Sequence, residues 1–185
     1  MTGLFGGAFN PPHLGHHELA RRALEHFDLE RLQILVSGDP AHKEVDCPVE
    51  QRVALAELAF AELPRTVVRA DPYRYTIDLL RAERPEDAIF LIGADQYRDF
   101  PTWKEAQAIL ELVHLGVATR AGVERPAIPA EHDGRVVFFE IDSPPISSSD
   151  LRARAGRGEP LDGFVSPAVA AEIARSELYR SPGLH

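Results

Sequence analysis

Cysteine and membrane-length apolar runs are scarce or missing in this chain. Cys47 is the only cysteine among 185 residues, which excludes a disulfide framework within the chain and suits a reducing cytoplasm. No apolar run approaches membrane-spanning length, and the N-terminus lacks the basic and then apolar layout of a signal peptide. We therefore expect a cytoplasmic protein with no membrane partner.

A surplus of positive charge is missing as well. The 20 Lys and Arg residues are outnumbered by 29 Asp and Glu residues, which gives a formal net charge of −9. Binding to double-stranded DNA or RNA relies on a broad positive surface, so we expect no nucleic-acid partner. A chain of this charge that binds polyanionic nucleotides needs cations concentrated at its site, and a divalent metal ion would assist them.

Length and hydrophobic patterning predict the fold. The 185 residues, 44% of them hydrophobic, suit a single domain over residues 1–185 with a full core. Apolar runs alternate with helical patterns, which predicts an α/β, doubly wound (Rossmann-like), mostly parallel sheet with helices on both faces. The expected strands are residues 2–5, 33–37, 66–69, 88–92, 115–119 and 136–139. The expected helices follow the first turn and Pro48, and then span residues 76–83, 104–112, 148–155 and 167–176.

The remaining long segments, residues 38–48 and 121–134, read as loops. Most of the expected strands are too uniformly apolar to be exposed on one side, so we expect them to be covered on both faces. In such sheets ligands bind at the carboxyl ends of the strands, and the motifs below all lie there.

The first turn, residues 6–16, reads Gly-Gly-Ala-Phe-Asn-Pro-Pro-His-Leu-Gly-His. It joins a strand to an amphipathic helix, so its glycines and the free amides of the helix start favour a bound phosphate. His13 and His16 add side-chain donors at the same place. The turn contains neither G-x-G-x-x-G nor a P-loop. It is instead similar to the H-x-G-H signature of the nucleotidyltransferase superfamily, in which a phosphate attacks the α-phosphate of a nucleoside triphosphate.

Two other interpretations of these histidines stay open at this point. They can serve only as a structural loop and cap, or they can bind zinc together with His17. A zinc site needs further ligands at suitable spacing, so we expect no metal to be bound by protein side chains.

A second helix start follows Pro145 and reads Ile-Ser-Ser-Ser-Asp-Leu-Arg over residues 146–152. Its serines and free amides, with Arg152 in the first turn of the helix, predict a second phosphate site. The segment resembles the superfamily's Ile-Ser-Ser-Thr-x-Ile-Arg, with Ser149 and Leu151 as conservative changes. The alternative is simple N-capping by Ser147 or Ser148 with Arg152 in solvent.

The middle of the chain resembles the nicotinate mononucleotide adenylyltransferases. Gly-Ala-Asp at residues 93–95 and Phe-Pro-Thr-Trp at residues 100–103 carry the similarity, and Tyr75-Thr76 at a helix start extends it. The resemblance implies that Asp95 binds ribose hydroxyls, that Trp103 stacks on a flat heterocycle, and that the amides at Tyr75-Thr76 meet the pyridine carboxylate. Without it, Trp103 reads as a core anchor and Thr76 as an N-cap.

Three further basic residues match the same family. His42-Lys43 in the loop after the second strand and Arg120 at the end of the fifth are implied to hold the mononucleotide phosphate. Ala41 and Ala121 replace prolines of the family pattern. Each basic residue would otherwise read as a solvated surface group. Lys104 has no assigned role.

Taken together, the resemblance implies a bacterial-type nicotinate-nucleotide adenylyltransferase, which converts ATP and nicotinate mononucleotide to nicotinate adenine dinucleotide and pyrophosphate. The implied catalytic residues are His13, His16 and Arg152, and Mg²⁺ is expected through the phosphates. The implied ATP-binding residues are Gly6, Gly7, Phe9, His13, His16, Gly93, Asp95, Ser147, Ser148 and Arg152. A sister enzyme acting on nicotinamide mononucleotide or phosphopantetheine, and a non-catalytic nucleotide-binding module, are the alternatives. Oligomeric state, including a homo-oligomer, is open.

Overall fold

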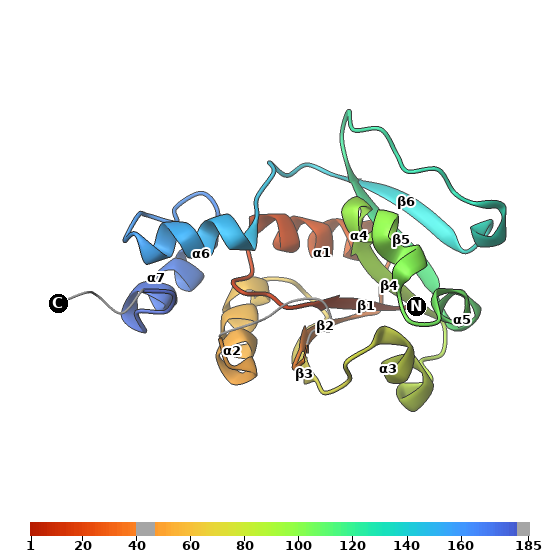
Figure 1. Ribbon diagram of the computed structural model, residues 1–185, viewed down its shortest axis with the longest axis horizontal. Helices are drawn as coiled ribbons and strands as arrows, with labels where there is room; N and C mark the ends of the chain where they lie inside the picture. Colours follow the sequence, from red (N-terminus) through yellow and green to blue (C-terminus); the bar gives the residue numbers. More distant parts are fainter. Residues whose placement is uncertain (40–46, 181–185) are drawn as a thin grey trace.

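The computed structural model describes residues 1–39 and 47–180, and in them it contains a six-stranded parallel sheet (Figure 1). The strands are β1 (Thr2–Gly7), β2 (Arg31–Ser37), β3 (Thr66–Asp71), β4 (Ala88–Gly93), β5 (His114–Arg120) and β6 (Val136–Ile141). Their order is β3-β2-β1-β4-β5-β6, and every neighbouring pair is parallel. The strand order therefore reverses between β1 and β4, where a ligand crevice forms in such sheets. The predicted Rossmann-like fold is confirmed.

Helices cover both faces of this sheet. They are α1 (Leu14–His26), α2 (Val49–Phe60), α3 (Thr76–Glu83), α4 (Ala94–Asp99), α5 (Ala106–Leu112), α6 (Ser148–Gly156) and α7 (Pro167–Arg175), with short 3-10 helices η1 (Phe100–Thr102) and η2 (Ala130–His132). Figure 1 shows α1 and α3 on opposite sides of the sheet. Within the described residues, no helix is both long and apolar enough to cross a membrane.

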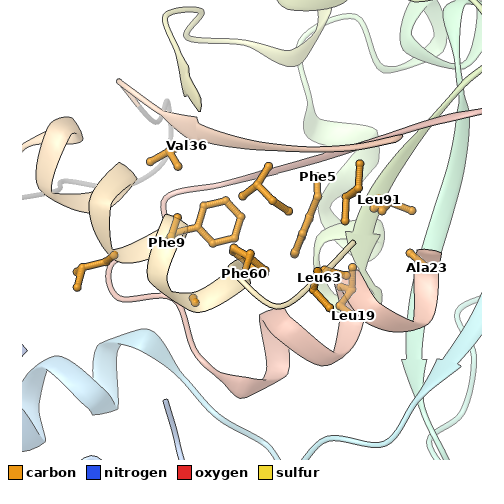
Figure 2. Close-up of a cluster of buried hydrophobic side chains, with 14 of the residues drawn as sticks. Phe5, Phe9, Leu19, Ala23, Val36, Phe60, Leu63 and Leu91 are labelled. Carbon is orange, nitrogen blue, oxygen red and sulfur yellow. The ribbon is translucent and has the colours of Figure 1, made fainter. Parts of the chain in front are cut away.

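Two buried clusters lie on the two faces, because successive residues of a strand point to opposite sides. Phe5 of β1 belongs to the cluster with α1, α2, α6 and α7, whereas Leu4 belongs to the cluster with α3, α4 and α5. In the first cluster Phe9 lies edge-on to Phe5 at 5.3 Å and to Phe60 at 5.7 Å between ring centroids (Figure 2). This packing seats the first turn on the hydrophobic core.

The segment after β4 differs from the prediction of one helix over residues 104–112. The chain forms α4 directly after the strand, continues through η1, and starts α5 only at Ala106. Pro101 and the left-handed backbone of Glu105, with φ of 53°, separate these pieces.

The outer strands also differ from the inner ones: β4 is almost fully buried, whereas β3 at the sheet edge is half exposed.

Candidate functional site

The carboxyl ends of β1, β4 and β5 open onto one cavity of about 810 Å³. Every predicted site residue within the described parts of the chain lines it. These residues are Gly6, Gly7, Phe9, His13, His16, Tyr75, Thr76, Gly93, Asp95, Trp103, Arg120, Ser147, Ser148 and Arg152. The remaining two, His42 and Lys43, lie outside the described residues. The cavity thus joins motifs that are far apart in the sequence, from Gly6 to Arg152.

His13 and His16 cap the start of α1 reciprocally. The Nδ1 of His13 accepts from the amide of His16 at 3.3 Å, and the Nδ1 of His16 accepts from the amide of His13 at 3.2 Å. The two rings stack with centroids 3.6 Å apart. An accepting Nδ1 carries no hydrogen, so in the neutral ring the hydrogen is on Nε2. His13 and His16 therefore cap the helix and also line the cavity, so the two interpretations of these side chains are compatible.

The charge state of His13 is set by its surroundings. Burial, together with the positive charge of Arg120, lowers its pKa to about 4. At neutral pH, His13 is thus an uncharged imidazole whose Nε2–H is a hydrogen-bond donor. Gly15 beside it has little room for a side chain, because a Cβ there would lie 3.1 Å from both the His13 ring and Ser143 Oγ. The glycine of the motif allows this close approach.

The start of α6 is tied directly to the first turn. Arg152 Nη1 donates to the carbonyl of Asn10 at 2.9 Å, and Ser148 Oγ donates to the carbonyl of Pro11 at 2.9 Å. Ser147 is the N-cap, and its Oγ accepts from the amide of Ser149. Arg152 is half-buried and lines the cavity, so its interpretation as a solvent-exposed side chain is wrong. Two helix starts therefore face one cavity, which is an arrangement suited to anions.

Phe9 makes a different contribution from the other residues of the turn. Its backbone has φ of 47°, in the left-handed region that residues with a Cβ rarely adopt, and its ring is 2% exposed. The aromatic packing on Phe5 and Phe60 holds this conformation. Phe9 thus lines the cavity mainly by shaping the turn rather than by offering a free ring.

Aromatic residues dominate the far side of the cavity. Trp103 is half-buried, with its ring centroid 5.4 Å from that of Phe100 and 6.2 Å from that of Phe90. It is thus anchored on the core and lines the cavity as well. Helix α3 starts at Thr76 with Tyr75 as N-cap, and no side chain caps it. The interpretation of Thr76 as the N-cap is therefore wrong, and the helix start lacks a competing side-chain acceptor.

The cations on this side are mostly paired with carboxylates. Lys104 Nζ lies 2.9 Å from Asp78 and 4.7 Å from the centre of the Tyr75 ring. Arg98 contacts Asp95 at 2.6 Å, so the carboxylate expected to bind ribose is exposed and shared with an arginine. Arg120 differs, since no carboxylate of the described residues lies within ion-pair distance of it. A Cβ at Gly93 would meet no atom within 4 Å apart from those of its two chain neighbours, so the space there is open to a ligand.

Several lining residues were not predicted. Arg74 and Arg98 lie at the rim, Asn10 lies inside the recognised turn, and Asp71 ends β3. Burial raises the pKa of Asp71, whose carboxylate accepts from the amide of Tyr73 at 2.9 Å. Its position at the carboxyl end of a strand is a signal that a sequence reading can use.

A parallel sheet of this strand order, with two helix starts facing the crevice at its reversal point, defines a Rossmann-like nucleotide-binding protein. Comparison with protein families makes the class specific. The model of the cytidylyltransferase-like family matches residues 4–154, and the chain belongs to this family.

Similar proteins cover nearly the whole chain. A curated Thermus thermophilus protein named "Probable nicotinate-nucleotide adenylyltransferase" is 40% identical over 188 residues, covering 96% of this chain and 98% of its own length. A protein of the same name from Albidiferax ferrireducens is 36% identical over 97% of this chain and 98% of its own. The solved Plasmodium falciparum nicotinic acid mononucleotide adenylyltransferase complexed with NaAD superposes with a TM-score of 0.81 at 14% identity, covering 96% of each chain, and confirms the fold.

Proposed function

We propose that this chain is a nicotinate-nucleotide adenylyltransferase that transfers the adenylyl group of ATP to nicotinate mononucleotide. The products are nicotinate adenine dinucleotide, a precursor in NAD biosynthesis, and pyrophosphate. The observation that carries the proposal is the convergence of His13, His16 and Arg152, from two helix starts, on one cavity. The names of the full-length relatives supply the substrate class.

The triphosphate half of the cavity comprises the first turn and the start of α6. Attack by an oxygen of the mononucleotide phosphate forms the new bond to the α-phosphorus of ATP, and the bond from that phosphorus to the bridging oxygen breaks as pyrophosphate leaves. The attacking phosphate has a second pKa near 6 and is mostly ionised at neutral pH, so no general base is required. His13, His16 and Arg152 stabilise the charge that develops on the phosphates.

The acceptor half comprises the carboxyl ends of β3, β4 and β5 with the helix starts that follow them. Arg120, with His42 and Lys43, holds the mononucleotide phosphate. The pyridine ring stacks on Trp103. Its carboxylate meets the uncapped amides at the start of α3, an environment of donors that suits an acid better than an amide. On the ATP side, Gly93 and Asp95 contact the ribose.

A divalent ion at this site would be bound by the phosphates of the substrate and not by protein side chains. Within residues 1–39 and 47–180, no three His, Cys, Asp or Glu side chains are grouped to hold a metal. Mg²⁺ commonly keeps several waters and binds through substrate phosphates, which agrees with this donor set. When bound, it would neutralise charge on the phosphates. The proposal also includes a cytoplasmic location and one domain over residues 1–185.

The test is a turnover assay of the purified chain with ATP and Mg²⁺. Nicotinate mononucleotide, nicotinamide mononucleotide and phosphopantetheine are compared as acceptors, and both pyrophosphate and the dinucleotide are measured. We expect nicotinate mononucleotide to give the highest kcat/KM. Preference for another acceptor would assign the chain to a sister enzyme, and no pyrophosphate with any acceptor would contradict the catalytic proposal.

A further inference from the structure

The rear of the first turn, away from the cavity, is held by two side chains that do not line the cavity. Arg52 Nη1 of α2 donates to the carbonyl of Ala8 at 2.8 Å. The hydroxyl of Tyr179, in the tail after α7, donates to Asn10 Oδ1 at 2.6 Å. Both partners belong to the turn, and both donors come from elements far away in the sequence. Neither donor belongs to the set of residues that line the cavity.

Arg52 is an unusual core residue. Its side chain is 1% exposed, and within the described residues no carboxylate pairs with it. Its guanidinium instead donates to three backbone carbonyls: that of Ala8, that of Ser37 at 2.7 Å, and that of Cys47 at 3.0 Å. These carbonyls belong to the first turn, to the end of β2 and to Cys47, which precedes Pro48, the N-cap of α2. One planar, permanently charged fork therefore fixes three separate segments relative to each other.

Tyr179 reaches the first turn through a backbone of unusual conformation. Its backbone has φ of 71° and that of Glu177 has φ of 50°, both in the left-handed region, so the tail adopts strained conformations where it reaches the turn. Burial raises the pKa of the Tyr179 hydroxyl, which therefore stays protonated and remains a donor. The acceptor, Asn10, is 6% exposed, and its own carbonyl receives Arg152. Tyr179 thus contacts the same residue that links the turn to α6.

We propose that Arg52 and Tyr179 are positioning residues for adenylyl transfer, acting through the first turn. They hold the Ala8 carbonyl and the Asn10 side chain on the rear of the turn, so that its remaining backbone and the two imidazoles keep their placement toward the phosphates. This inference rests on the proposed function. A displacement of reacting groups by about 1 Å can lower a rate by about a hundredfold, so a rear contact of this kind acts on kcat.

The first test uses Tyr179→Phe and Arg52→Met, assayed where each variant is fully folded. We expect kcat to fall about five- to tenfold for the lost hydroxyl bond and about a hundredfold for the lost fork, with KM for ATP within twofold of wild type. Arg52→Lys should recover part of the loss. Values of kcat within twofold of wild type for both variants would overturn the inference.

Two control variants separate positioning from stability. Tyr97→Phe removes another buried hydroxyl contact, that with His132 at 3.0 Å, outside the cavity. Leu110→Ala creates a void in α5 on the opposite face of the sheet, where Leu110 is 1% exposed. We expect both controls to keep near-normal kcat at the same folded fraction. Losses equal to those of Tyr179→Phe and Arg52→Met would assign the effect to stability and overturn the inference.

A measurement independent of turnover completes the test. Amide hydrogen exchange of residues 8–16 should accelerate in Tyr179→Phe and Arg52→Lys and stay unchanged in Tyr97→Phe. Unchanged exchange in all three would overturn the inference even if the wild-type chain showed no adenylyl transfer. A wild-type chain without turnover but with accelerated exchange in the two variants would instead contradict the proposed function alone.

Discussion

The two halves of the cavity treat their positive charges differently. In the triphosphate half, Arg152 bonds the Asn10 carbonyl and, at 3.4 Å, Ser149 Oγ, with no carboxylate of the described residues at ion-pair distance. In the acceptor half, Lys104 pairs with Asp78, and Arg74 pairs with Asp39. Carbonyl and hydroxyl partners position a cation without cancelling its charge, whereas a carboxylate cancels it.

This difference shows how a chain with a net charge of −9 can bind polyanions. Each half has one arginine without a carboxylate partner among the described residues: Arg152 where the triphosphate is proposed to bind, and Arg120 at the acceptor side. Exposed pairs such as Lys104–Asp78 leave little net attraction for an anion. Recognition of the pyridine ring and its carboxylate therefore depends more on ring stacking and backbone amides than on charge.

The largest expected effect tests the triphosphate half. His16→Ala should lower kcat by about 10²–10³ while the fold survives, which is the usual scale for a lost donor to a developing oxyanion. Steady-state kinetics with ATP and nicotinate mononucleotide give the value, and circular dichroism checks folding. His17→Ala is the matched control, because this neighbouring histidine is not among the lining residues. Near-normal turnover of His16→Ala would defeat the assignment.

A smaller effect is expected from the ring of the acceptor half. Trp103→Ala should raise KM for nicotinate mononucleotide about tenfold or more, since stacking of a base on an aromatic ring contributes about 1–3 kcal/mol. KM for ATP should change little, and Trp103→Phe should recover much of the affinity. If only the thermal midpoint fell and KM did not change, Trp103 would be a core anchor alone.

Freeing a paired cation should produce a modest gain. Asp78→Asn removes the partner of Lys104, so we expect KM for the anionic acceptor to fall about two- to threefold at low salt, in keeping with the small strength of exposed pairs. Glu83→Gln makes the same charge change on α3 beside Arg69, away from the lining residues, and should have no such effect. Equal KM values for Asp78→Asn and wild type would show that the pair does not weaken acceptor binding.

A further effect is on stability against pH. The pKa of His13 is lowered to about 4 in the folded chain, against about 6.5 when unfolded, so between these values the unfolded state binds the extra proton. The free energy of unfolding therefore falls as pH drops from 6.5 to 4. His13→Asn should flatten this slope in denaturant titrations at a series of pH values. An identical slope in His13→Asn would show that His13 is not the group responsible.

The sequence predicted most of the fold because the inner strands are continuous apolar runs between clear helical patterns. It failed after β4, where α4 has only six residues and too little periodicity to detect. The residues of the two phosphate-binding turns were predicted because their motifs lie at strand ends and helix starts, and the other predicted lining residues came from the family resemblance. The rear contacts of Arg52 and Tyr179 were not predicted, since they depend on which carbonyls the folded chain brings together, and no local pattern encodes that.

The reciprocal cap of His13 and His16 affects how the first turn tolerates substitutions. Each ring's hydrogen is placed on Nε2 by a main-chain amide of the other residue and not by its side chain. Substitutions of surrounding side chains do not change which ring nitrogen carries the hydrogen. Only proline at position 13 or 16 would remove the backbone amide that donates to the other ring. A substitution at one of the two positions therefore leaves the hydrogen of the remaining histidine on Nε2, unless the new residue is proline.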